Sequence, residues 1–358
     1  MISPLLDDIF RAAVANGASD IILRSGQRAV FRINGELAAV ESELPGEQDL
    51  ADLWSACGAE GSELDRDASL TTEEGVRFRV NLLRQLGVRG AVLRRIQNQI
   101  PSMESLGLPC ELLREWAQRP SGIVIVCGPT GSGKSTTLAS VLDWINGAMA
   151  RHIVTIEDPV EYLFTAKMSY FTQREVGIDT PSFAEGLRRS LRQNPDIIFL
   201  GEIRDAPSAV TAIQAAETGH LVLATVHAAG CADVVARLEL LFPADERESV
   251  RKTLAEQLLG VLCQRLLPAV SGGRALLCEY FSNEASSRRL IAEGRMSELL
   301  DFVSRGDPRS VRSFADSLLQ LVRAGTVAEA VAMENADNPQ EFARSLRGIS
   351  SSMQATRR

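Results

Sequence analysis

The chain has 358 residues, with 38 basic and 46 acidic side chains and a formal net charge of −8. A composition that is 45% hydrophobic and 23% charged excludes a disordered or collagen-like protein, and the length predicts about two or three domains. The acidic balance argues against a protein whose main partner is nucleic acid.

Residues 1–97 are predicted to form a small α+β domain. Helical spacing of apolar residues predicts a helix over Pro4–Ala15 that stops at Gly17. Asn34-Gly35 predicts the type I′ turn of a hairpin. In the later strand Val76–Leu83, Phe78 and Val80 are expected on the face opposite Arg77 and Arg79. Other strands are predicted at Ile21–Leu23, Ala29–Ile33, Glu36–Val40, Ser69–Thr72 and Ala91–Ile96, with a helix at Gln48–Ala56.

Residues 98–119 are predicted to be a linker with one short helix, and residues 120–358 a second domain. Four short apolar runs alternate with helical segments, which is typical of a mostly parallel sheet with crossover helices. Farther on, a period of 3.6 residues predicts a helix over Asp245–Leu267, and short helices are expected from about residue 283 to 358. The linker helix is Cys110–Gln118, and the apolar runs are Ile123–Cys127, Ile153–Ile156, Ile197–Leu200 and Leu221–Thr225.

The sequence predicts a cytoplasmic protein without membrane insertion. The amino terminus has no basic segment before its apolar residues, which argues against a secretory signal. No apolar stretch approaches the ~20 residues that span a bilayer. Six scattered cysteines form no CxxC pair, so we expect small buried thiols in a reducing compartment.

A phosphate-binding loop follows the first apolar run of the second domain. The segment from Gly128 to Ser135 matches G-x-x-x-x-G-K-[ST] completely, and a helix-forming run follows it. Only three lysines occur in the chain, and Lys134 stands where an ammonium would reach the β- and γ-phosphates of ATP. The hydroxyl of Ser135 would bind Mg²⁺. Predicted nucleotide-binding residues are Gly128, Pro129, Thr130, Gly131, Ser132, Gly133, Lys134, Ser135 and Thr136.

Acidic residues follow two further apolar runs. Glu157 and Asp158 end one run, and Gly201 and Glu202 follow another. Ligand clefts of parallel sheets lie at the carboxyl ends of strands, so these carboxylates are candidates for holding Mg²⁺ and ordering the attacking water. Ser135, Glu157 and Glu202 are therefore the predicted Mg²⁺ site, the last two directly or through water.

Two of the three histidines bracket one apolar run. His220 precedes Leu221–Thr225 and His227 follows it. A structural role competes with a γ-phosphate-sensing role for His227, and the absence of cysteine or aspartate at ligand spacing argues against zinc. His227 is predicted to be a catalytic residue and His220 a nucleotide-binding residue.

Arginines that could clamp a nucleotide occur in both domains. Guanidinium groups bind phosphate through a planar fork, and arginine fingers commonly come from a second subunit. Such a clamp predicts a ring of subunits, whereas solvated surface ion pairs are the alternative for each arginine alone. The candidates are Arg77, Arg79, Arg94, Arg188, Arg189, Arg192 and Arg204.

Together these motifs resemble the type IV pilus retraction ATPases, the PilT-like branch of the type II and type IV secretion ATPase superfamily. The resemblance covers nearly the whole chain. The motifs are Ala18-Ser-Asp20, Arg77-Phe-Arg79-Val-Asn81, the Walker A loop Gly128–Thr136, the Asp box Thr155–Glu161, Arg174-Glu-Val-Gly, the atypical Walker B Gly201–Asp205, and the His box Ala216–His220 with His227.

The resemblance implies a PAS-like amino-terminal domain joined to a RecA-like ATPase domain. It further implies a homohexamer with nucleotides between subunits, docked from the cytoplasm on an inner-membrane platform protein of the pilus machinery. Glu202 would be the catalytic glutamate and Glu157 a second acid near the metal. Arg79 and Arg94 would reach the phosphates, and Arg204 would lie beside the nucleotide. The implied activity is hydrolysis of ATP that drives pilus retraction and twitching motility.

The sequence departs from the family's motifs in two places, which leaves alternative functions to consider. The family's carboxy-terminal retraction motif is reduced here to Ser286–Glu293, and Ala228 and Ala229 replace the usual threonines after His227. A PilU-like accessory or a divergent paralogue is therefore an alternative. A missing tetracysteine site argues against an assembly or secretion ATPase. A nucleic-acid motor and a nucleotide-gated regulator with little turnover are the remaining classes, and the few aromatic residues, 5%, count against the former.

Overall fold

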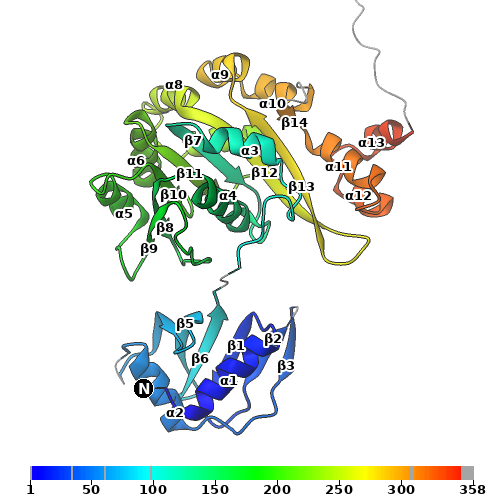
Figure 1. Cartoon of the computed structure of the whole chain (residues 1–358). Coiled ribbons are helices and arrows are strands. Elements are labelled where there is room, and N and C mark those ends of the chain that lie inside the picture. Colours follow the sequence, from blue (N-terminus) through cyan, green and yellow to red (C-terminus); the bar gives the residue numbers. More distant parts are fainter. Residues whose placement is uncertain (1, 34, 60–61, 97–98, 306–309, 348–358) are drawn as a thin grey trace, which may run out of the picture. The chain divides into compact units, whose positions relative to one another are not determined.

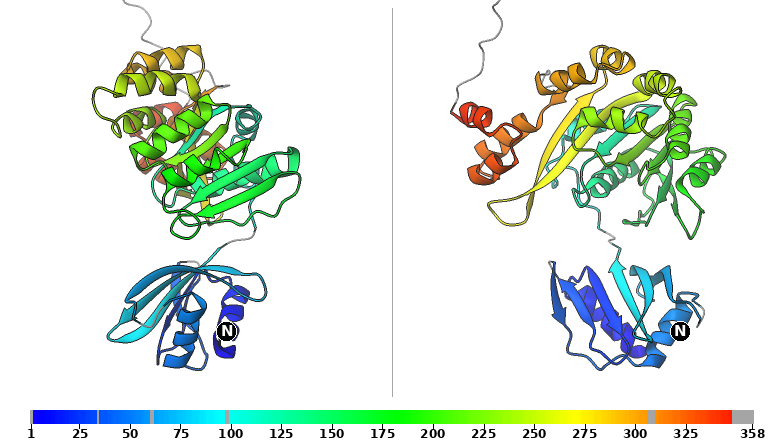
Figure 2. Two further views of the ribbon diagram at one scale, coloured as in Figure 1. Left: turned by 90° about the vertical axis from the view of Figure 1, so that its left-hand side faces the viewer. Right: turned by 180° about the vertical axis from the view of Figure 1, so that it is seen from behind.

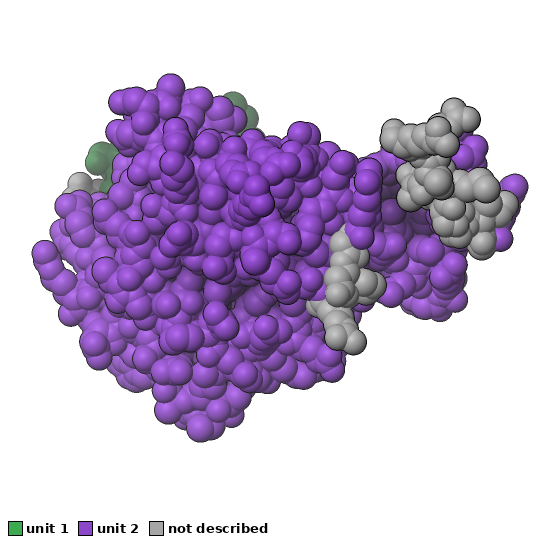
Figure 3. All heavy atoms as spheres, turned by 90° about the horizontal axis from the view of Figure 1, so that it is seen from above, with its two compact units in different colours: residues 1–99, 159–163 green, residues 100–158, 164–358 purple. Residues whose placement is uncertain are grey.

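The chain forms two compact units. The computed structural model describes residues 2–33, 35–59, 62–96, 99–305 and 310–347. One unit holds residues 1–99 with 159–163, and the other holds residues 100–158 with 164–358 (Figure 3). Each unit has its own cluster of buried hydrophobic side chains.

The amino-terminal unit is a six-stranded antiparallel sheet with two helices (Figure 1). Its strand order is β3-β2-β1-β6-β5-β4. Helix α1 spans Pro4–Ala15 as predicted, because Ser3 caps its first turn and proline occupies its first position. The remaining elements are β1 (Asp20–Arg24), β2 (Val30–Ile33), β3 (Glu36–Ala39), α2 (Glu47–Ala56), β4 (Asp65–Thr71), β5 (Arg77–Gln85) and β6 (Val88–Arg95).

The alternation predicted for the arginine strand is confirmed in β5. Phe78 and Val80 are buried, whereas Arg77 and Arg79 are partly exposed. Strands β2 and β3 pair antiparallel, as a hairpin requires. Asn34, on which the predicted turn type rests, lies outside the described residues.

The carboxy-terminal unit is built on an eight-stranded sheet of order β14-β13-β12-β7-β11-β10-β8-β9. The strands from β12 to β9 run parallel, and β13 and β14 are antiparallel additions at one side. The predicted mostly parallel sheet, the core of a RecA-like fold, is thus confirmed. The strands are β7 (Gly122–Cys127), β8 (His152–Glu157), β9 (Tyr170–Glu175), β10 (Ile197–Leu200), β11 (Leu221–Val226), β12 (Leu258–Pro268), β13 (Arg274–Ser282) and β14 (Val311–Arg312).

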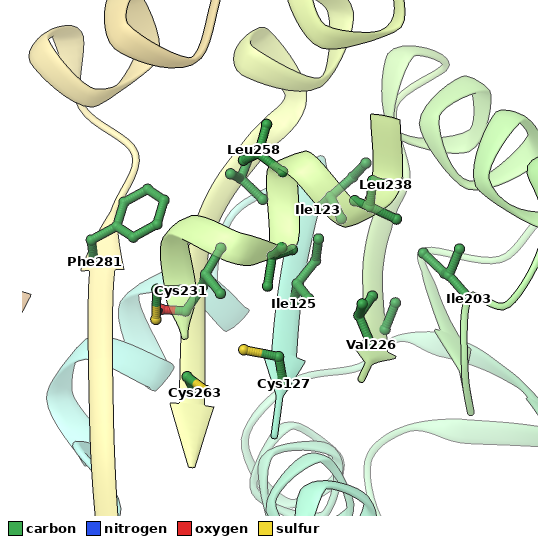
Figure 4. Packing of buried hydrophobic residues seen from close by; sticks show 14 of the residues in the cluster. Ile123, Ile125, Cys127, Ile203, Val226, Cys231, Leu238, Leu258, Cys263 and Phe281 are labelled. Carbon is green, nitrogen blue, oxygen red and sulfur yellow. The ribbon is translucent and has the colours of Figure 1, made fainter. Parts of the chain in front are cut away.

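Helices cover both faces of this sheet (Figures 1 and 2). On one face Trp116, Leu138 and Val126 belong to one cluster of buried side chains, and on the other Leu238 lies beside Ile123 (Figure 4). Strands enclosed in this way have no polar face, which is why the sequence shows unbroken apolar runs. The helices are α3 (Cys110–Ala117), α4 (Lys134–Ala148), α5 (Phe183–Ser190), α6 (Ala206–Glu217), α7 (Cys231–Glu239) and α8 (Arg247–Gln257).

Short helices follow β13, as predicted. They are α9 (Ala285–Ala292), α10 (Met296–Arg305), α11 (Phe314–Arg323), α12 (Glu329–Asn335) and α13 (Pro339–Leu346). The predicted helical segment extends to residue 358, but residues 348–358 lie outside the described part, as do residues 97 and 98 at the predicted domain boundary.

The single helix predicted over Asp245–Leu267 is wrong in its second half. Helix α8 ends at Gln257, and the chain continues as β12 between β7 and β13. An unbroken apolar run fits either a buried strand or a helical period, so spacing alone misassigned it. Gly260 allows the close packing of this strand, because a Cβ there would lie 2.2 Å from the ring of Trp116.

The cysteines are unpaired thiols, and five of the six are buried. Cys127, Cys231 and Cys263 lie close together in the core of the carboxy-terminal unit (Figure 4). Burial raises the pKa of the Cys231 thiol to about 12. None of the helices in the described part of the chain combines the length and apolar character that crossing a bilayer requires.

Candidate functional site

The predicted site residues converge at one edge of the parallel sheet. The phosphate loop follows β7, Glu157 ends β8, Glu202 comes two residues after β10, and His227 directly follows β11. These strands are neighbours in register, since Val226 of β11 pairs with the last residue of β7. Carboxyl ends of parallel strands share an edge, so the fold itself gathers these side chains.

Glycine is required at several turns of the phosphate loop. Gly131 and Gly133 have φ values of +78° and +86°, a region that other residues rarely adopt. At Gly128 the constraint is also steric, because a Cβ would lie 2.3 Å from the carbonyl oxygen of Gln264. Gly133 directly precedes α4, so the loop ends at a helix N-terminus whose N–H groups and dipole favour an anion.

Lys134 is the first residue of α4 and is buried, with 8% of its surface exposed. Its Nζ donates to the carbonyl oxygens of Gly128 and Pro129 at 3.0 Å each. The side chain therefore folds over the loop, with its charge held where the loop would receive a phosphate. Ser135 and Thr136 follow in the same first turn.

Glu157 is a buried carboxylate, 4% exposed, at the end of β8. Its Oε1 accepts a hydrogen bond from Thr155 Oγ1 at 2.7 Å and one from Gln173 Nε2 at 3.5 Å. Both partners come from β8 and β9, which hold the carboxylate in a fixed orientation.

Glu202 lies in a small network of charged side chains. Its Oε2 accepts from Arg204 Nε at 2.6 Å, and its Oε1 lies 3.3 Å from His227 Nε2. Arg204 also reaches Asp158 Oδ2 at 3.3 Å. Hydrogen bonding to Glu202 is the main cause that raises the pKa of Arg204, which keeps this guanidinium charged. The structure thus joins the Asp box, the Walker B segment and the histidine.

The structure does not bring His220 to this edge of the sheet. His220 precedes β11 and His227 follows it, so the two rings are separated by the length of a six-residue strand, about 20 Å. The ring of His220 instead bonds at its own edge, with Nδ1 2.9 Å from the carbonyl oxygen of Ala215. His220 therefore lies away from Glu202 and His227 within this chain, and its assignment to nucleotide binding stays a prediction.

Arg79 and Arg94 face each other on neighbouring strands of the amino-terminal unit. Arg94 Nε lies 2.8 Å from Asp20 Oδ1, and Arg79 reaches Asp67 at 3.9 Å. Arg94 is 70% exposed, so its guanidinium is open to further partners. In contrast, Arg188 and Arg189 pair with Glu185 on the surface of α5, which matches the surface alternative for them.

The segment after His227 is anchored from the carboxy-terminal strands. Arg265 donates to the carbonyl oxygen of Ala229 at 3.2 Å, and the buried carboxylate of Glu279 accepts from the backbone N–H of Cys231 at 2.7 Å. Burial raises the pKa of Glu279, opposed by the hydrogen bonds from Cys231 and the charge of Arg265, while Asp337 raises it further. These anchors fix the direction in which the chain leaves β11, and hence the place of His227.

Glu279→Gln is expected to stabilise the protein more at pH 8 than at pH 5. A raised pKa in the folded state means that the native carboxyl holds its proton more tightly than the unfolded one, so stability falls as pH rises above about 4.5 through the folded pKa. Glutamine can accept the same bond from Cys231 and does not titrate. Thermal unfolding should show a Tm advantage of a few degrees for the variant at pH 8. Glu217→Gln, at an exposed glutamate, is the control, and a Tm advantage that shrinks with rising pH would contradict the expectation.

Two residues of the site were missed by the sequence analysis. Gln264 and Thr137 are almost fully buried, and they form a hydrogen bond to each other beside the phosphate loop. The available signal was the pair Gln264-Arg265 inside an otherwise apolar run, which is costly in a core unless the polar groups are used. Because this run was predicted to be helical, this signal was not recognised.

The donors at this edge suit a magnesium-bound nucleotide. Mg²⁺ prefers oxygen ligands and usually takes one or two from the protein, with the remainder from phosphate and water. The Ser135 hydroxyl and the carboxylates of Glu157 and Glu202 are such donors. Among the described residues there is no cluster of three or more histidine, cysteine or acidic side chains suited to a metal held by protein alone. The chemistry that fits is transfer of a phosphoryl group to water.

The chain is similar to known proteins. A family model described as type II/IV secretion system protein matches residues 1–276. The type IV pilus retraction ATPase PilT of Pseudomonas aeruginosa is 35% identical, over 94% of this chain and 99% of its own. The type IV pilus ATPase PilU of the same species is also 35% identical, over 94% and 90%.

A solved structure is also similar to this chain. The crystal structure of the pilus retraction motor PilT with bound ADP superposes with a TM-score of 0.86, at 37% identity. The match covers 96% of this chain and all of that one, so it includes both units and the phosphate loop.

Proposed function

The chain belongs to the type II/IV secretion system protein family, and from this premise we propose that it is a Mg²⁺-dependent hexameric ATPase that powers type IV pilus retraction. The observation that carries the proposal is the convergence of Lys134, Glu202 and His227 at one edge of a parallel sheet, in a chain similar to PilT over nearly its full length.

In this proposal each residue at the edge has a defined task. The loop N–H groups and Lys134 bind the β- and γ-phosphates of ATP. Glu202 orients the attacking water and accepts its proton, while His227, 3.3 Å away, reports whether the γ-phosphate is present. Bound Mg²⁺, held by Ser135 with Glu157 and Glu202 nearby, would supply neutralisation of the charge on the phosphates.

Arg79 and Arg94 are assigned to the phosphates of a nucleotide between subunits. Their exposure on adjacent strands supports the assignment, because a planar guanidinium can bind phosphate only where it is accessible. The ring would dock on an inner-membrane platform protein from the cytoplasm, and nucleotide-driven movements of its subunits would drive filament disassembly.

A second candidate is a PilU-like accessory of the main motor. Helix α9 and its C-cap residue Glu293 contain the reduced retraction motif Ser286–Glu293, and buried side chains pack this helix against the rest of the unit. Ser287 is fully buried and bonds to Asn283 at 3.0 Å, and Ile291 is buried as well. The departures from the family motif include the buried Ser287 and the exposed Arg289, and Arg289 pairs with the retained Glu293.

Deletion of the gene is expected to abolish twitching and leave cells with excess surface pili, because assembled filaments would no longer be withdrawn. Pili are counted by electron microscopy and movement is scored at an agar interface, with the deletion complemented by the wild-type gene as control. Loss of all pili would indicate an assembly motor instead. Normal pili and movement would favour the accessory or a paralogue.

A further inference from the structure

Gln264 lies in β12 and is 1% exposed, and both ends of its side-chain amide are hydrogen-bonded. The Nε2 group donates to the carbonyl oxygen of Ser132 at 2.6 Å, and Oε1 accepts from Thr137 Oγ1 at 2.9 Å. One partner belongs to the phosphate loop and the other to the first turn of α4. A single side chain therefore ties the loop to the helix on which its anion site depends.

The backbone of the same residue also contacts the loop. A Cβ atom on Gly128 would lie 2.3 Å from the carbonyl oxygen of Gln264. A Cβ atom on Gly133 would lie 3.3 Å from Gln264 Nε2. The start, middle and end of the loop thus rest against one residue of β12.

This support matters because the loop is rich in glycine. Three of its residues have positive φ, and such a segment has many alternative conformations of similar energy. A loop whose N–H groups must converge on phosphate binds it more tightly when that conformation is already held. Buried hydrogen bonds specify geometry, because breaking them leaves polar groups unsatisfied.

We propose that Gln264 is a positioning residue that holds the phosphate loop in the conformation that receives a nucleoside diphosphate. The inference rests on the proposed nucleotide-binding function. Gln264 acts through Ser132 and Thr137 and touches no phosphate itself.

The same strand provides a matched control. Leu267, three positions farther along β12, is buried in the hydrophobic core of the carboxy-terminal unit. Damage to β12 as a whole would affect both positions, whereas loss of the loop support would affect Gln264 alone.

The test is titration of the full-length protein with a fluorescent ADP at 20 °C, with thermal unfolding measured for every variant. Gln264→Leu keeps the size but removes both bonds, and it is expected to weaken ADP binding about tenfold. Thr137→Val removes one bond without touching Gln264 and should weaken binding about threefold. Because the bonds act together, the double variant should lose no more than Gln264→Leu alone.

Leu267→Ala and the core variant Leu299→Ala are expected to lower Tm while leaving the ADP affinity within about twofold of wild type. Unchanged ADP affinity in Gln264→Leu or Thr137→Val would overturn the inference. So would an equal loss of affinity in Leu299→Ala at a similar Tm. Failure of the wild-type protein to bind ADP would instead refute the proposed function and the inference with it.

Discussion

Lys134→Ala is expected to eliminate ATP hydrolysis. The ammonium of Lys134 is the cation that the loop itself supplies, and its Nζ is held 3.0 Å from two loop carbonyl oxygens. Removing it leaves the negative charge that develops on the phosphates without its fixed counter-charge. Loss of one such stabilising group lowers turnover by about 10²–10³-fold, and we expect at least that here. ATP affinity should fall about tenfold or more.

The measurement is phosphate release at saturating Mg²⁺-ATP, with nucleotide affinity determined separately. Lys167→Ala is the matched control, because it removes another lysine of the same unit, whose surface ion pair with Asp143 contributes at most about 1 kcal/mol to stability. Turnover in Lys134→Ala close to that of wild type would exclude the phosphate loop as the site of hydrolysis.

Glu202→Gln is expected to bind ATP with nearly wild-type affinity and to hydrolyse it about 10³-fold more slowly. Glutamine keeps the size of the side chain and can still accept a hydrogen bond from Arg204, but it cannot take a proton from the attacking water. The structure places this carboxylate between Arg204 and His227, and Arg204 also donates a hydrogen bond to Asp158. Binding and turnover should therefore separate in this variant.

Glu157→Gln distinguishes the two acids. Glu157 is buried and held by Thr155, so its replacement should lower turnover less than Glu202→Gln does if it acts on the metal through water. Pre-steady-state release of phosphate and binding of a fluorescent ATP are measured for both variants. Normal hydrolysis by Glu202→Gln, with severe loss in Glu157→Gln, would transfer the catalytic role to Glu157.

The phosphate loop was predictable because its chemistry is local. Gly128, Gly131, Gly133 and Lys134 lie within seven residues, and a strand and a helix flank them in the chain. The carboxylates were predictable for a related reason. Buried strands leave a clear apolar signature, and the residue after such a run must lie at the edge of the sheet.

One assignment failed where the sequence pattern had two physical interpretations. The apolar run of β12 satisfies a helical period as well as a buried strand, and only its place between β7 and β13 decides between them. His220 and His227 flank the same strand, but its two ends lie at opposite edges of the sheet, and only the structure shows which of the two lies beside Glu202.

The sequence by itself determined the fold class, the phosphate loop and the family to which the chain is similar, because these depend on residues that are close in the chain. Only the tertiary structure decided that Gln264 supports the loop, that Arg204 links Asp158 to Glu202, and that Glu279 anchors the segment after His227. Gln264 and Thr137 are 127 positions apart. No periodicity encodes such a contact, since it arises when parallel strands pack side by side and each buried polar group must find a partner.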